Sequence, residues 1–411
     1  MTEPLRALSR LQITVAVFAS VVLAYMAFDF SFLLSARRVD PEGTYRTRPT
    51  EPGVVAAAMN YRMVQINEFK IGVDDKSNIR AGLVREPLNR VLLRTLAIQD
   101  EISGRQEHAK RKMELASQVS RRDTITQLWL GEYFRRSGKP EREIAHYHAA
   151  LQVKPDLRKV LFPKIMSSLQ SPEYQKNVGS YLRQDVDWAA PFLITSTLPN
   201  VNLVDLDDVL NTVEPFLGLL SKPKFTEAVS NIIFRLEIDG RRAEALSVMR
   251  NVWPDFDVNR YSQFGWNASN TDNRLGTLAW KFADDANISP SLTASGALTL
   301  WVAPGVAVEG LARDVSVRPG TSYVISHHYD NTGTPAPVGL KWQGFCIAED
   351  KISSVWESAM QMSKRKGVHV FQFVTPANCH LMRIVGSVVG PDSQLPGELN
   401  ISTPILKEAE V

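Results

Sequence analysis

The chain has few of the residues and motifs from which enzymes build active sites. Its 411 residues include two cysteines and seven histidines, and the G-x-S-x-G, P-loop, G-x-G-x-x-G and H-E-x-x-H patterns are absent. His146 and His148 stand two apart in a helical stretch, so they cannot form a metal pair on one helix face. We therefore expect no catalytic residue, no metal and no cofactor. A degenerate glycosidase remains the alternative, because two carboxylates that face each other across a cleft leave no sequence pattern.

Net charge is small and unevenly distributed. At +3 it is too weak to indicate a nucleic-acid partner. Between Arg85 and Lys164, 17 basic residues accompany 10 acidic ones, so this stretch is either a solvated helical surface or a face for an anionic partner. The chain is longer than one hydrophobic core usually serves, which predicts two or three domains.

One long hydrophobic run, residues 11–34, contains Asp29 as its only charged residue. As a helix it would cover about 36 Å, enough to cross the roughly 30 Å hydrocarbon core of a bilayer. The run is long for a signal peptide and no small-x-small cleavage site follows it before Arg37, which favours an uncleaved anchor in the lipid bilayer. Asp29 lies either near the interface or against a partner helix within the membrane.

Helical patterns with a 34-residue period follow the anchor. Residues 38–53 hold three prolines and two glycines and predict a linker, and residues 54–254 have helical periodicity. Five positions recur after 34 residues: Leu96 and Leu130, Ala97 and Gly131, Gly104 and Gly138, Met113 and Tyr147, Ala116 and Ala150. Over 90–156 this pattern resembles the tetratricopeptide repeat, although Glu143 stands where a small residue is expected. Residues 241–254 resemble the second helix of a later, degenerate unit, whereas 160–235 fits no such register. The resemblance implies stacked hairpins that hold a partner protein.

Short alternating runs replace the helical pattern after Pro254. The strand-like segments are 297–304, 321–329, 338–347, 369–375 and 380–389. Several short strands at this spacing predict an antiparallel sandwich of jelly-roll type. Cys346 and Cys379 both lie in or beside these strands, as either two buried thiols or one disulfide, and a disulfide would imply an oxidising compartment.

Residues 264–407 resemble β-sandwich carbohydrate-binding modules. The phrases that carry the resemblance are VRPGTSYVISHHYDNTG, LKWQGFC, FQFVTPANCHLMRIVG and GELNISTPIL. It implies glycan binding through exposed aromatic rings with polar neighbours. Trp301 and Trp342 lie in strong strands, where core packing is expected, whereas Trp266 and Trp356 lie in loop-like stretches that favour exposure. The predicted glycan-binding residues are Trp266, Trp356, Tyr329, His327 and Asp330.

The predicted fold is multidomain α + β, with a transmembrane helix, a tetratricopeptide-like α-solenoid and a β-sandwich. We divide it into a cytoplasmic N-terminus and anchor at 1–37, a linker at 38–53, helices at 54–254 and a sandwich at 255–411. This order, with YLRQDVDWAAPFL at 181–193, resembles membrane proteins of bacterial exopolysaccharide gene clusters. The resemblance implies a non-catalytic scaffold or accessory protein for polysaccharide synthesis or export. A structural subunit of a membrane protein complex is the alternative.

Orientation in the membrane draws on opposing signals. Four arginines follow the hydrophobic run closely and two precede it, which by the positive-inside rule would keep the large C-terminal part in the cytoplasm. A disulfide and a sugar-binding sandwich favour the outside, and long domains translocate largely regardless of charge. We predict a single-pass protein of the bacterial inner membrane with a periplasmic soluble part.

Overall fold

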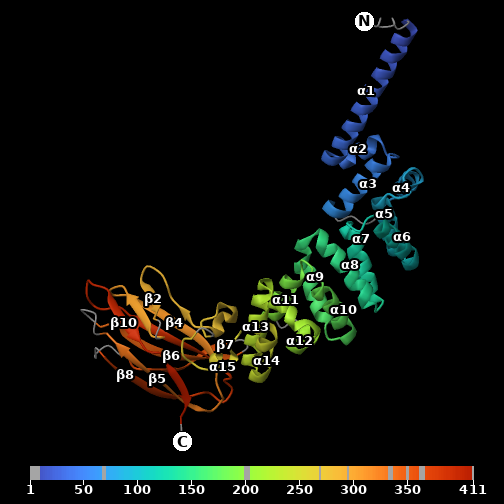
Figure 1. Ribbon diagram of the computed structural model, residues 1–411. Helices are drawn as coiled ribbons and strands as arrows, with labels where there is room; N and C mark the ends of the chain where they lie inside the picture. The colour runs from blue at the N-terminus through green and yellow to red at the C-terminus, as the bar shows by residue number, and fades with distance from the viewer. Residues whose placement is uncertain are drawn as a thin grey trace, which may run out of the picture. The chain divides into compact units, whose positions relative to one another are not determined.

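The computed structural model describes residues 10–66, 71–198, 204–267, 270–293, 296–331, 337–348, 351–360 and 366–409 (Figure 1). The chain divides into two compact units, Met1–Leu157 and Arg158–Val411. The described part of the first unit is helical. The second unit holds further helices followed by a β-sandwich.

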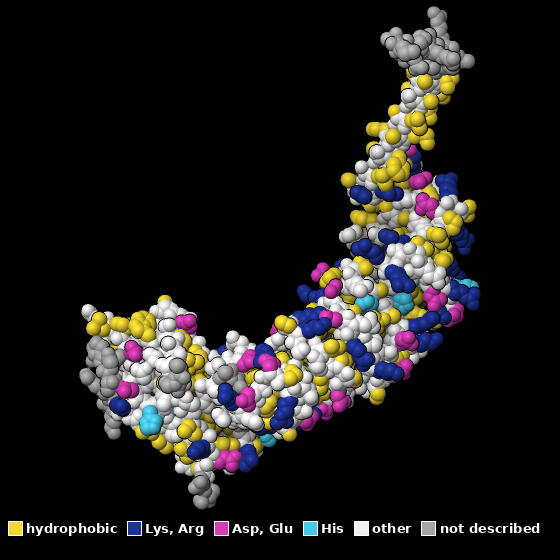
Figure 2. All heavy atoms as spheres, in the orientation of Figure 1, with side chains coloured by type: hydrophobic (Ala, Val, Ile, Leu, Met, Phe, Trp, Pro, Cys, Tyr) yellow, Lys and Arg dark blue, Asp and Glu magenta, His cyan; other side chains and the backbone are white. Residues whose placement is uncertain are grey.

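A long exposed helix, α1 (Arg10–Val39), opens the first unit. Its segment Val15–Val39 is long and apolar enough to cross a membrane, and Figure 2 shows apolar side chains along it. The guanidinium of Arg48 donates two hydrogen bonds to the carboxylate of Asp29, at 2.5 and 3.0 Å. Because Asp29 has an ionic partner in its own chain, no second helix is needed to explain a charge in this apolar run.

The residues predicted to form a linker fold instead as part of a small helical core. The elements here are α2 (Pro41–Thr47), α3 (Pro52–Tyr61), the π-helical turn η1 (Arg62–Ile66) and α4 (Val73–Arg85). Tyr45 on α2 is buried, and its hydroxyl donates to Asp75 on α4 at 2.7 Å. The linker prediction is therefore wrong for these residues, because tertiary contacts of Tyr45 hold a segment that its proline and glycine content marks as irregular.

Two helical hairpins follow at an interval of 34 residues. They are α5 (Arg90–Ile102) with α6 (Gln106–Val119), and α7 (Thr124–Arg136) with α8 (Pro140–Val153). Gly104 and Gly138 make the two turns with positive φ angles of 76° and 62°, a conformation that glycine adopts without strain. The predicted period is confirmed in these helix boundaries. Its small and large positions are buried in both hairpins: Ala97, Met113 and Ala116, then Gly131, Tyr147 and Ala150.

The second hairpin uses a glycine where the first uses an alanine, because its plug is larger. A Cβ atom on Gly131 would lie 2.4 Å from Cε1 of Tyr147. Overpacking typically costs about 1–3 kcal/mol, which outweighs the gain of about 1 kcal/mol in helix propensity. We expect Gly131→Ala to lower the free energy of unfolding by about 1–2 kcal/mol, measured by urea denaturation followed by circular dichroism.

The chain supplies its own control for this substitution. Combining Gly131→Ala with Tyr147→Met reproduces the Ala97–Met113 pair of the first hairpin, and this double variant should recover most of the lost stability. It also loses the hydrogen bond from Tyr147 to Glu132 at 2.8 Å, so recovery need not be complete. A single variant as stable as the native chain would show that the close approach of ring and backbone is not required.

Helices of the second unit partly continue the 34-residue interval. They are α9 (Arg158–Ser168), α10 (Pro172–Arg183), α11 (Ala189–Thr197), α12 (Leu206–Val213), α13 (Thr226–Ile238), α14 (Arg242–Val252) and α15 (Val258–Tyr261), with 3-10 segments η3 (Glu214–Ser221), η4 (Pro223–Phe225) and η5 (Asn273–Leu278). α9 begins 34 residues after α7, and α13 begins three such intervals after α7. Gly240, with φ 73°, turns α13 into α14 as Gly104 and Gly138 turn the earlier hairpins. The expectation that 160–235 follows no such register is therefore wrong at α9 and α13.

The strands form two antiparallel sheets that pack face to face, as the sequence predicts. The first sheet has the order β1-β4-β9-β6-β7, and the second has β2-β3-β10-β5, with β8 and β11 both pairing to β5. The strands are β1 (Lys281–Phe282), β2 (Ile288–Leu292), β3 (Leu298–Val302), β4 (Ala307–Ser316), β5 (Ser322–Asp330), β6 (Gly339–Ala348), β7 (Lys351–Glu357), β8 (Lys366–Val374), β9 (Leu381–Val389), β10 (Gly397–Ile401) and β11 (Ile405–Glu408). Their inner faces enclose one apolar core that includes Leu300, Ile325, Trp342 and Ile384. A disulfide joins Cys346 on β6 to Cys379, just before β9, with both side chains buried.

A buried arginine fastens the sandwich to the segment that leads into it. The guanidinium of Arg313 on β4 donates to the backbone carbonyls of Tyr261, Gln263, Phe264 and Leu278, at 3.0–3.1 Å. Burial lowers the pKa of Arg313 to about 10, which still leaves the side chain charged at neutral pH. These four bonds compensate for burying the charge, since each satisfies a carbonyl that is itself withdrawn from water.

Candidate functional site

The outer face of the second sheet presents an exposed tryptophan. In β3 the alternation of Leu298, Leu300 and Val302 turns these side chains into the core, so Trp301 points the other way. Trp301 is 41 % exposed, the most of any tryptophan that the structure describes. An aromatic ring of this size gains little from folding when it is left in water, so its exposure marks a surface that can bind a partner.

Polar side chains from the neighbouring strands surround this ring. Ser289 on β2 and Glu398 on β10 lie in register with Trp301, one on each side. The next outward row crosses five strands and is entirely polar: Ser291, Thr299, Asn400, Asp330 and Lys366. With strands about 4.8 Å apart, this row is about 19 Å long. We call these eight residues the tryptophan face.

The polar groups of the tryptophan face are held by one another. The hydroxyl of Thr299 donates to Oδ1 of Asn400 at 2.5 Å, and the amide of Asn400 donates to Glu398 at 3.3 Å. Lys366 lies 3.7 Å from the carboxylate of Asp330. The face therefore offers fixed donors and acceptors beside an exposed ring, without a concave wall on either side.

The predicted exposures of the tryptophans are largely reversed. Trp266 is 4 % exposed and packs edge-on against Trp280, so its predicted exposure is wrong. Trp356 is partly buried and stacks on Phe373, with ring centroids 4.6 Å apart. Trp301, for which core packing was expected, is the exposed one. The alternation of leucines in β3 was the signal that could have placed it, since it assigns Trp301 to the face opposite the core.

The predicted glycan-binding residues of β5 separate onto two faces. His327 and Tyr329 point into the core and are 3 % and 5 % exposed. Nε2 of His327 accepts a hydrogen bond from the indole N–H of Trp342 at 2.8 Å, and burial lowers the pKa of His327 to about 4. His327 is therefore a neutral core acceptor. Asp330 alone joins Trp301 on the tryptophan face.

Known proteins give a partial comparison. No family model matches the chain, and no curated protein matches it. Solved structures that it resembles include a module described as CBM4, with 17 % identity and a TM-score of 0.24 over 32 % of this chain and 94 % of that one. A C-terminal family 22 carbohydrate-binding module of Clostridium thermocellum is 14 % identical, with a TM-score of 0.25 over 36 % of this chain and 95 % of that one. The N-terminal cellulose-binding domain of a Cellulomonas fimi β-1,4-glucanase is 17 % identical, with a TM-score of 0.24 over 32 % of this chain and 90 % of that one.

These neighbours are carbohydrate-binding modules, as the resemblance of residues 264–407 implies. TM-scores this low carry no argument about what the chain binds. The sandwich is established by its own strand order, and any function must be argued from the tryptophan face itself.

Proposed function

We propose that the β-sandwich binds a carbohydrate chain on the tryptophan face. The observation that supports it is Trp301, exposed on a sheet face whose neighbouring outward side chains are hydroxyls, amides and carboxylates. An aromatic ring can stack on the apolar face of a sugar, while groups of this kind bond the hydroxyls at the sugar's edge. The face is flat and crosses several strands, so it fits a segment within a polysaccharide better than a single enclosed sugar.

The remaining parts suit a tethered accessory protein without catalysis. α1 would hold the chain in a bilayer, and the helical hairpins, which resemble tetratricopeptide repeats, would bind a partner protein. The disulfide between Cys346 and Cys379 favours an oxidising compartment and hence a periplasmic sandwich. The proposed role is therefore an accessory protein of polysaccharide synthesis or export in a bacterial envelope.

A second function is favoured by the outer edge of β8. Val368, Val370 and Val374 are 55–59 % exposed along this strand, and Ile405 on β11 is 47 % exposed. An aliphatic strip of this kind is typical of protein contacts rather than of sugar contacts. The sandwich would then serve as a structural subunit of a membrane complex.

Substitution of Trp301 separates the two functions. We expect the soluble part of the native chain to be retarded in affinity electrophoresis by at least one of a panel of neutral and acidic polysaccharides. Trp301→Ala should weaken that binding about 10- to 30-fold, as truncation of an aromatic anchor commonly does. Val368→Ala on the same sheet is the control and should bind normally. Retardation by no polysaccharide, or equal retardation of Trp301→Ala and the native chain, would contradict glycan binding at this face.

A further inference from the structure

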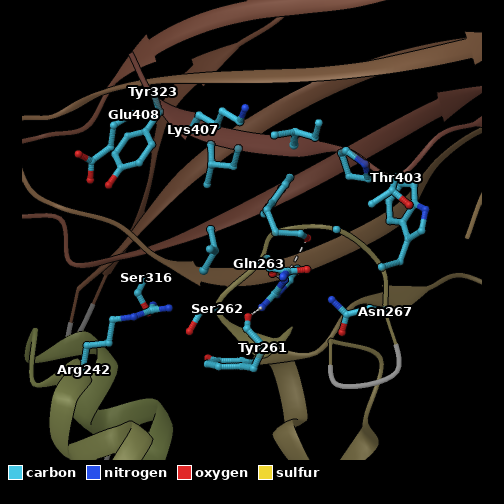
Figure 3. A pocket seen from close by; sticks show the side chains of 18 residues that line it. Arg242, Tyr261, Ser262, Gln263, Asn267, Ser316, Tyr323, Thr403, Lys407 and Glu408 are labelled. Atoms are coloured by element: carbon cyan, nitrogen blue, oxygen red, sulfur yellow. Dashed lines mark hydrogen bonds between the residues drawn. The ribbon is translucent and has the colours of Figure 1, made fainter. Parts of the chain in front are cut away.

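A second candidate site lies within the Arg158–Val411 unit, where its last helical hairpin meets the sandwich. A cavity of about 640 Å³ opens between the start of α14, the segment 261–267, and strands β4, β5 and β11. Figure 3 shows Arg242 entering from the helical side, with Tyr323, Lys407 and Glu408 on the opposite wall. It shares no residue with the tryptophan face.

The cavity walls carry hydrogen-bond donors that have no acceptor. Trp266 lines the cavity and is 96 % buried, as its 4 % exposure gives, yet its indole N–H has no partner in the described part of the chain. The hydroxyl oxygen of Tyr323 accepts from the backbone N–H of Arg318 at 2.9 Å, which leaves its own hydrogen to donate. Lys407 forms no ion pair with any described residue. Burying an unpaired donor costs free energy, so these groups indicate a ligand rich in acceptors.

Charge around the cavity favours an anion. Arg242 lies 3.9 Å from the carboxylate of Glu237, its one ionic partner among the described residues. Glu237 also accepts from Ser316 at 2.5 Å, and burial raises its pKa. The other carboxylate on the wall, Glu408, is already paired with Arg318 at 3.1 Å. Arg242, Lys407 and the buried Arg313 therefore outweigh the acidic side chains that remain.

The shape of the lining narrows the class of anion. Rings of Tyr261, Phe264, Trp266 and Tyr323 line the cavity together with the polar side chains of Ser262, Gln263, Asn267 and Thr403. A phosphate or small inorganic anion needs donors gathered at one point, whereas these donors stand on opposite walls. Aromatic walls with separated donors suit a ring that has an apolar face, several hydroxyls and one carboxylate.

We infer that this cavity binds a single carboxylate-bearing sugar, a hexuronate. Arg242 and Lys407 receive its carboxylate, the indole N–H of Trp266 and the phenol of Tyr323 donate to its oxygens, and the aromatic rings cover its apolar face. The site needs α14 and the sandwich together, so an acidic sugar bound here stabilises the contact between the last hairpin and the strands.

Calorimetric titration of the full chain in detergent with glucuronate, glucose and acetate tests this inference. Glucuronate should bind, and glucose and acetate should bind at least about 10-fold more weakly, since each lacks half of the recognised chemistry. Lys407→Gln, an exposed change without a partner to lose, should weaken glucuronate binding about 5- to 10-fold. Trp266→Phe keeps the ring but removes the N–H, and it should weaken binding with little change in melting temperature.

Controls separate this site from the tryptophan face. Lys351→Gln, on exposed β7 outside the cavity, and Trp301→Ala should both leave glucuronate affinity unchanged. No binding of glucuronate by the native chain would overturn the inference, as would equal binding by the native chain and Lys407→Gln. Binding of acetate as tight as that of glucuronate would overturn the sugar class, because the cavity would then recognise a carboxylate alone. Loss of polysaccharide binding in Trp301→Ala with glucuronate binding intact would show that the two sites stand or fall separately.

Discussion

Replacing Arg313 by methionine is expected to lower the free energy of unfolding by about 3–5 kcal/mol, the range seen when a buried charged network loses one member. The methionine fills much of the same volume but donates to none of the four carbonyls that Arg313 satisfies. Those carbonyls belong to the backbone, so no neighbouring side-chain change can remove them. The buried carboxylate of Glu237 also loses a nearby positive charge. Differential scanning calorimetry of the native and variant chains measures the loss.

Arg318→Met is the matched control for this prediction. Arg318 lies five residues along the chain, and its side chain is 76 % exposed and pairs with Glu408 at 3.1 Å. An exposed pair of this kind contributes about 0–1 kcal/mol, so the control should unfold close to the native temperature. If the two variants were equally stable, the network around Arg313 would not be what fastens the sandwich to the segment before it.

Reduction of the disulfide should produce the second large effect. Cys346 and Cys379 are 33 residues apart, and closing a loop of that length stabilises the native state by about 3–4 kcal/mol in the chain-entropy treatment. We expect a reductant to lower the denaturation midpoint of the sandwich by a corresponding amount, measured by urea unfolding followed by tryptophan fluorescence.

The paired variant Cys346→Ala/Cys379→Ala provides the reference state. It should unfold where the reduced native chain unfolds, and reductant should not change it further. Two thiols that react with a thiol reagent in the denatured, non-reduced protein would contradict the bond. The argument for an oxidising compartment would then be lost with it.

Local patterns predicted the elements whose causes are local. The apolar run of α1, the hairpin turns at Gly104 and Gly138, and the alternation in β3 and β5 each depend on residues within a few positions of one another. The same patterns gave the small and large positions at Gly131 and Tyr147, because helical packing repeats with the sequence.

The features that failed depend on contacts across long stretches of chain. Tyr45 is buried because Asp75 and the α4 helix cover it, and nothing in the proline-rich sequence around it indicates that cover. Trp266 sits in a loop by its neighbours, yet Trp280 and Phe282 enclose it. The cavity could not be predicted at all, since Arg242, Trp266 and Lys407 come from segments that only the fold brings together.

Hydroxyl-radical footprinting read by mass spectrometry tests glycan binding on the tryptophan face most directly. An exposed indole is oxidised readily, and Trp301 is the most exposed of the described tryptophans. With a polysaccharide that retards the protein in affinity electrophoresis, the account predicts strong protection of Trp301 and of the β10 peptide that carries Glu398 and Asn400, with unchanged oxidation at Val368 and Val370. Unchanged oxidation at Trp301, or protection confined to the valines of β8, would contradict it.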